Sequence, residues 1–65
     1  MNPSDREALR RHLEQLGLYG RDLKYKDVKN LIDALNRSGE RGLADQIIRL
    51  DHFTNVTDFI RRNVG

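Results

Sequence analysis

The chain of 65 residues has no cysteine and no tryptophan, and it contains a single proline. Without cysteine it forms no disulfide and no thiolate metal site, so its stability must come from packing. The lack of cysteine also fits a reducing, intracellular setting. A domain this short buries only about 60% of the surface that its unfolded chain exposes. We therefore expect one small, marginally stable domain over residues 1 to 65.

Long apolar runs and an excess of one charge are also lacking. No apolar run approaches the roughly 20 residues that a transmembrane helix needs. The opening residues, MNPSDREALRRH, have no apolar stretch of the secretory-signal type. These two absences favour a cytoplasmic location and no membrane partner. Twelve lysines and arginines face ten aspartates and glutamates, and this near balance is only a weak argument for nucleic-acid binding, which needs clustered cations.

Motifs that carry chemistry are missing as well. The only two histidines, His12 and His52, have no partner at metal-ligand spacing, so we expect a structural or solvated role for each. Ser4 and Ser38 are explained by a helix cap and a turn. The glycines form neither a phosphate-binding loop nor a dinucleotide fingerprint. We therefore expect no catalytic residue, no metal, no cofactor and no small-molecule substrate, which means a protein that is not an enzyme.

What is present is helical periodicity. Apolar residues recur at spacings of three and four along most of the chain, and no long alternation of apolar and polar residues indicates a strand. The pattern predicts an all-α fold, a compact bundle of four short helices. They are expected at about residues 5 to 16, 25 to 37, 40 to 50 and 55 to 63. A turn around residues 18 to 23 is the only candidate for a fifth.

Polar residues predict where these helices begin and end. Ser4 with Glu7 three residues later has the pattern of a capping box. The second helix has two candidate caps: Lys24, which is chemically poor, and Asp22, which is better. Two glycines are expected at the left-handed positions that follow helices, Gly17 and Gly39.

The apolar stripes predict the core, and the charges predict the outer faces. The expected core residues are Ala8, Leu9, Leu13, Leu16, Val28, Leu31, Ile32, Leu35, Leu43, Ala44, Ile47, Ile48, Leu50, Phe53, Val56, Phe59, Ile60 and Val64. Opposite charges four residues apart predict weak ion pairs, namely Glu7–Arg11, Lys29–Asp33, Asp33–Arg37, Arg41–Asp45, Asp45–Arg49 and Asp58–Arg62. A mixed-charge surface follows from this pattern.

The stretch NLIDALNRSGERGLADQI, residues 30 to 47, resembles the helix pairs of death-fold domains and of their bacterial counterparts, the effector-associated or death-like domains. The residues that carry the resemblance are Leu31, Ile32, Ala34, Leu35, Gly39, Leu43, Ala44 and Ile47. The match covers under a third of the chain. The resemblance implies an adaptor or regulator that does no chemistry and docks to a like domain.

The leading hypothesis is a protein–protein interaction module that docks a partner, or itself, through a mixed-charge helical surface. Aromatic and arginine side chains are the usual anchors of such contacts. The candidate partner-binding residues are Arg10, Arg11, Tyr19, Arg21, Arg61 and Arg62.

Two alternatives stay open. One is a small nucleic-acid-binding regulator in which the arginines of the two terminal helices share one face: Arg10, Arg11, Arg61 and Arg62. The helix pair around Gly39 is less suited to reading DNA, because its second helix would present Glu40 and Asp45 to the phosphates. The other is a self-assembling subunit, which requires Phe53, Phe59 and Val64 to form an exposed apolar patch.

Overall fold

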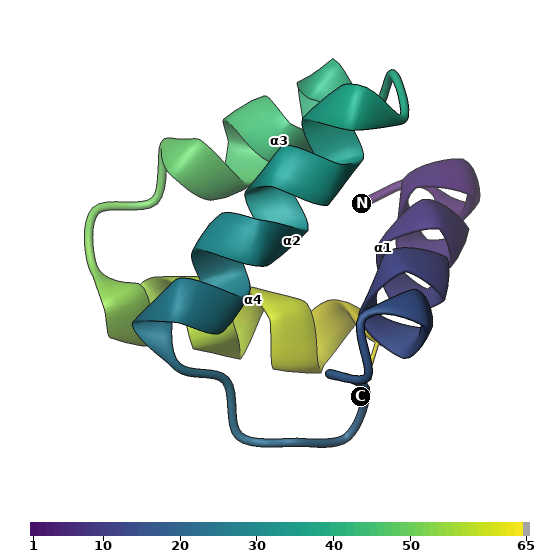
Figure 1. Ribbon diagram of the computed structural model, residues 1–65. Helices are drawn as coiled ribbons and strands as arrows, with labels where there is room; N and C mark the ends of the chain where they lie inside the picture. The colour runs from purple at the N-terminus through teal and green to yellow at the C-terminus, as the bar shows by residue number, and fades with distance from the viewer. Residues whose placement is uncertain (65) are drawn as a thin grey trace.

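The computed structural model describes residues 1–64 and consists of four helices joined by short connections (Figure 1). They are α1 (Pro3–Gln15), α2 (Tyr25–Arg37), α3 (Arg41–Ile48) and α4 (Phe53–Val64). No strand occurs in the described residues, so the predicted all-α class is confirmed. The segment between α1 and α2 contains turns and no fifth helix. None of the helices within residues 1–64 is long and apolar enough to cross a membrane.

Helix α2 is central to the bundle. It packs against both α3 and α1, and α1 packs in addition against α4 (Figure 1). The last residue of α4 lies beside the connector that follows α1, because the Tyr19 hydroxyl donates a hydrogen bond to the Val64 carbonyl oxygen at 3.2 Å. The C-terminal end of α4 is thereby held against the segment that joins α1 to α2.

The core consists of the apolar faces of all four helices together with Leu18 of the first connector. Its buried residues are Ala8, Leu9, Leu13, Leu18, Val28, Leu31, Leu35, Leu43, Ala44, Ile47, Val56 and Ile60. Three residues expected in the core are exposed instead: Leu16 by 38%, Ile48 by 56% and Phe53 by 39%. Ile48 is the last residue of α3, Phe53 is the first residue of α4, and Leu16 directly follows the last residue of α1.

The helix stops are confirmed at both glycines. Gly17 and Gly39 have positive φ angles of 72° and 81°, which an L side chain rarely adopts. After α1, the Leu18 N–H donates to the Leu13 carbonyl at 2.8 Å. After α2, the Glu40 N–H donates in the same way to the Leu35 carbonyl. Both helices therefore end in a Schellman motif, which satisfies carbonyl groups that the helix leaves free.

The predicted cap of α1 is wrong. The helix begins at Pro3, and the Asn2 side chain accepts a hydrogen bond from the Asp5 N–H at 2.7 Å. Proline is favoured at this first position because it lacks only an N–H that the helix does not use. Ser4 therefore lies inside the first turn, where the predicted capping box with Glu7 does not form.

Helix α2 has the predicted bounds, whereas those of α3 and α4 differ from the expected bounds by a few residues. Lys24 is the residue before α2, and its backbone N–H donates to the Asp27 carboxylate at 2.8 Å. The start of α2 is therefore stabilised by a side chain of its own first turn, not by the side chain of Lys24. Helix α3 is shorter than expected and leaves Leu50 in the following connection, partly buried against the core. Helix α4 starts at Phe53, two residues earlier than expected.

The ion pairs also differ from the predicted set. Those formed among residues 1–64 are Arg10–Glu14 at 3.7 Å, Arg11–Glu40 at 4.0 Å and Arg61–Asp58 at 3.6 Å. All six predicted pairs lie outside this set. Only one of the three observed pairs has the spacing of four. The outer surface is mixed in charge, as expected, but its ion pairs join other residues than the predicted ones.

Candidate functional site

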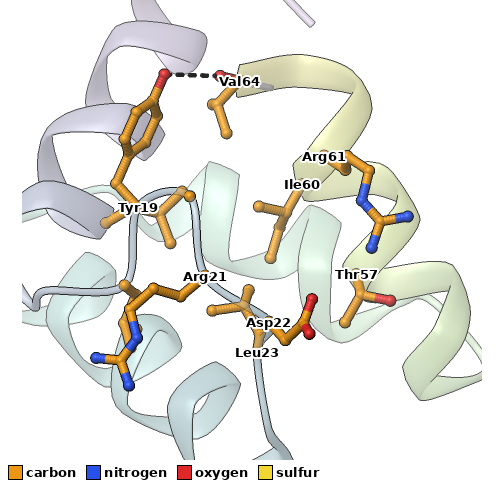
Figure 2. A pocket seen from close by; sticks show the side chains of 11 residues that line it. Tyr19, Arg21, Asp22, Leu23, Thr57, Ile60, Arg61 and Val64 are labelled. Carbon is orange, nitrogen blue, oxygen red and sulfur yellow. Dashed lines mark hydrogen bonds between the residues drawn. The ribbon is translucent and has the colours of Figure 1, made fainter.

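A cavity lies between the first connector and the C-terminal half of α4 (Figure 2). Its volume is about 280 Å³. The apolar part of its lining consists of Leu13, Leu18, Leu23, Ile60 and Val64. Since these residues also belong to the core or pack against it, the floor of the cavity is a rigid part of the fold.

Tyr19 is the aromatic residue of this cavity. It follows Gly17 and Leu18 in the turn after α1, and its ring remains 42% exposed. Its hydroxyl group is bonded to the Val64 carbonyl, which fixes the ring at the edge of the cavity (Figure 2). The guanidinium carbon of Arg10 lies 5.7 Å from the ring centroid, within the range of a cation–π contact. Tyr19 thus joins α1, the connector and α4 in one surface.

Arginine and aspartate form the polar part of the cavity. Arg61 projects from α4 and Arg21 from the connector, and both line the cavity. The Arg21 guanidinium donates to the Gly17 carbonyl at 3.1 Å and extends away from α4 (Figure 2). Asp22 lies on the connector with its carboxylate directed toward the α4 side, where Thr57 also contributes its side chain (Figure 2). The cavity mouth is therefore mixed in charge.

The structure brings together four of the six predicted partner-binding residues. Tyr19, Arg21 and Arg61 line the cavity, and Arg10 covers the Tyr19 ring. The remaining two residues lie elsewhere. Arg11 pairs with Glu40 just before α3, and Arg62 borders a second, shallow hollow that Asn55, Asp58 and Arg61 also line.

A second surface was missed by sequence reasoning. Tyr25, Ile48 and Phe53 are all exposed, and they line a groove of about 330 Å³ where α2, α3 and α4 meet. Two of them had been placed in the core, and the patch proposed from Phe53, Phe59 and Val64 does not form. The reason is that Phe59 and Val64 pack against the core. The pairing of Tyr25 with Phe53, whose ring centroids are 6.5 Å apart, depends on tertiary structure and left no local signal.

The two histidines lie in different environments. His12 is buried, with hydrogen bonds to the Ala8 carbonyl and the Ser38 hydroxyl, whereas His52 is exposed in the connection before α4. Within residues 1–64, no group of three or more histidine, aspartate or glutamate side chains is placed to hold a metal ion. The Tyr19 cavity combines an apolar recess with arginine, aspartate and hydroxyl groups at its edge. Such a surface can bind a ligand through apolar and polar contacts together.

Comparison with protein-family models, curated proteins and solved structures finds no match to this chain. The death-fold resemblance of residues 30 to 47 therefore stays a prediction.

Proposed function

We propose that this chain is a protein-interaction module without catalytic activity, which binds a segment of a partner protein in the Tyr19 cavity. The observation that carries the proposal is an apolar recess lined by Tyr19 and Arg61, with Arg10 stacked on the Tyr19 ring. Aromatic and arginine residues at the rim of such a recess are the typical anchors of protein contacts. An adaptor role, as the death-fold resemblance implies, is consistent with this proposal.

The size of the cavity favours one anchoring side chain. At about 280 Å³ it falls just below the range of about 300 to 1,000 Å³ that is usual for small-molecule sites. An aliphatic or aromatic side chain that enters it would replace water over Leu18, Leu23 and Ile60. Such burial contributes roughly 1.5–3 kcal/mol for a side chain of the size of Leu or Phe.

The charges at the mouth favour a carboxylate next to that anchor. Arg61 lines the cavity, and Arg10 contacts the Tyr19 ring at its edge. Each has one acidic neighbour, at 3.6 Å for Arg61 and 3.7 Å for Arg10, and all four side chains are at least half exposed. Exposed pairs of this kind are worth little and exchange partners readily. A glutamate or aspartate of the partner can therefore bind either arginine, while Asp22 disfavours a second carboxylate on the connector side.

Nucleic-acid binding remains the alternative class, but the geometry favours it less. Of the four arginines assigned to it, Arg10, Arg11 and Arg61 each lie within 4.0 Å of an acidic side chain. Arg62 borders a hollow shared with Asp58. Phosphate binding depends on clustered cations without such neighbours, so we expect no shift of nonspecific duplex DNA even at about 50 mM salt, where phosphate contacts are strong.

The test is a titration of ¹⁵N-labelled protein with short peptides that carry a central Leu or Phe flanked by glutamates. We expect amide shifts confined to residues 18–23 and 57–64. Matched peptides with lysines in place of the glutamates serve as the charge control, and we expect them to bind more weakly. Shifts spread over other surfaces, or none at millimolar peptide, would contradict the proposal. A shift of duplex DNA at low salt would favour the alternative.

A further inference from the structure

The groove at the junction of α2, α3 and α4 is a second exposed apolar surface. Its exposed residues are Tyr25 by 70%, Ile48 by 56% and Phe53 by 39%. They come from the first residue of α2, the last residue of α3 and the first residue of α4. Between them the groove continues down to the buried side chains of Val28, Ile47 and Val56. Single exposed apolar residues are ordinary, but three gathered around one groove mark an interaction surface.

Charged residues of opposite sign flank this groove. Asp51 lies in the connection between α3 and α4 and belongs to the lining. Lys29 is exposed on α2, and as the residue four positions after Tyr25 it lies on the same side of the helix, one turn further along. Lys29 is thus the cation beside the groove on α2, and Asp51 is the carboxylate of the groove lining on the other side.

We infer that a second copy of this chain binds in the groove, related to the first by a twofold axis that passes through the apolar patch. In such an isologous contact, each flank of one copy meets the opposite flank of the other. Lys29 of each copy then faces Asp51 of its partner, while Tyr25, Ile48 and Phe53 meet across the axis. The surface is self-complementary in both charge and hydrophobicity.

The size of the protein supports this occupant. A chain of 65 residues without disulfides has a small core, and proteins of this size often gain stability by self-association. Because only the folded state dimerises, dimer formation stabilises the fold as the protein concentration rises. Burial of the three exposed apolar side chains supplies the driving force.

The groove and the Tyr19 cavity are independent surfaces. Phe53 and Val56 place the groove at the N-terminal end of α4, and Ile60 and Val64 place the cavity at its C-terminal end. Occupation of one therefore does not require or prevent occupation of the other. A dimer would present two partner-binding cavities.

Sedimentation equilibrium over micromolar to millimolar protein tests the inference. We expect a reversible monomer–dimer equilibrium, with the dissociation constant raised about tenfold or more by Ile48→Lys. The matched control is Leu16→Lys, which adds the same charge at the end of α1, at a side chain of 38% exposure outside the groove. A chain that is monomeric throughout, or a dimer that tolerates Ile48→Lys or is weakened equally by Leu16→Lys, would overturn the inference.

A charge exchange tests the twofold arrangement. Asp51→Lys and Lys29→Asp should each weaken self-association, since each puts like charges opposite one another. A mixture of the two variants should recover it as a heterodimer, because both cross-contacts then pair a cation with an anion. Failure of the mixture to associate more tightly than either variant alone would overturn the twofold pairing. We expect the Ile48→Lys variant to bind peptide at the Tyr19 cavity as tightly as the wild type does. This measurement distinguishes a failure of the dimer inference from a failure of the proposed function.

Discussion

Ser38 donates a hydrogen bond to the buried ring of His12, with 2.9 Å between the Oγ and Nε2 atoms. The other ring nitrogen, Nδ1, lies 2.8 Å from the Ala8 carbonyl oxygen, which can only accept. Nδ1 therefore carries the proton, and in the neutral ring Nε2 is the acceptor. This relationship ties the last turn of α1 to the turn between α2 and α3, and it assigns His12 a structural role.

Replacement of Ser38 by alanine should destabilise the fold. The substitution leaves the Nε2 atom of a 5% exposed histidine without a partner, and an unsatisfied buried polar atom costs about 1–3 kcal/mol. Urea denaturation should show a lower midpoint with an unchanged slope. Ser4→Ala is the control, because both serines are exposed but only Ser38 is hydrogen-bonded to the buried His12 ring. The control should change the free energy of unfolding by less than about 0.5 kcal/mol. Equal effects of the two substitutions would contradict the role of Ser38.

Two glycines should respond to alanine in opposite directions. Gly39→Ala forces an L side chain into a φ of +81°, which costs about 1–2 kcal/mol. Gly42 has an ordinary helical backbone in the first turn of α3, and a Cβ there meets nothing within 4 Å. Gly42→Ala should therefore stabilise the protein by about 0.4–1 kcal/mol. Thermal melts of both variants measure the difference, and a stabilising Gly39→Ala would show that the Schellman turn is misassigned.

The N-terminal cap of α1 gives a third stability test. Asn2→Ala removes the acceptor of the Asp5 N–H and should cost about 1 kcal/mol, a typical value for a lost cap. The same denaturation experiment compares it with Ser4→Ala. If Ser4 proves the more sensitive position, the capping box expected from the sequence is correct and the Asn2 cap is not.

The sequence was most informative where a local signal decides the structure. The bounds of α2, residues 25 to 37, were predicted as they stand, because the stripe of Val28, Leu31 and Leu35 ends cleanly at Gly39. The start of α1 was misplaced since Asn2 and Ser4 are both good caps on either side of Pro3. Only the backbone conformation of Asn2, which is extended, distinguishes them.

Features that depend on tertiary contacts were out of reach. Nothing local shows that the ring of His12 meets Ser38, because the two residues are 26 positions apart. Ile48 is exposed at the end of α3, which stops at this residue. The apolar periodicity predicts a helix that continues to residue 50. The candidate site was predicted in part for the same reason: arginines and Tyr19 were recognised by type, but which of them share a cavity depends on how α4 meets the first connector.

The proposed function depends on the neighbours Arg61 and Arg62. They have the same charge and both lie in the last turn of α4, but only Arg61 lines the Tyr19 cavity. Charge reversal at each should therefore have the same effect on the helix and a different effect on binding. Tyr19→Ala should weaken binding as well, because it removes the aromatic rim.

Fluorescence anisotropy of a labelled glutamate-flanked Leu or Phe peptide, measured against the wild type and these variants, is the most direct test. We expect Arg61→Glu and Tyr19→Ala to raise the dissociation constant by about tenfold or more, while Arg62→Glu leaves it within about threefold. Equal losses for Arg61→Glu and Arg62→Glu, or no measurable binding by the wild type, would contradict partner binding in the Tyr19 cavity.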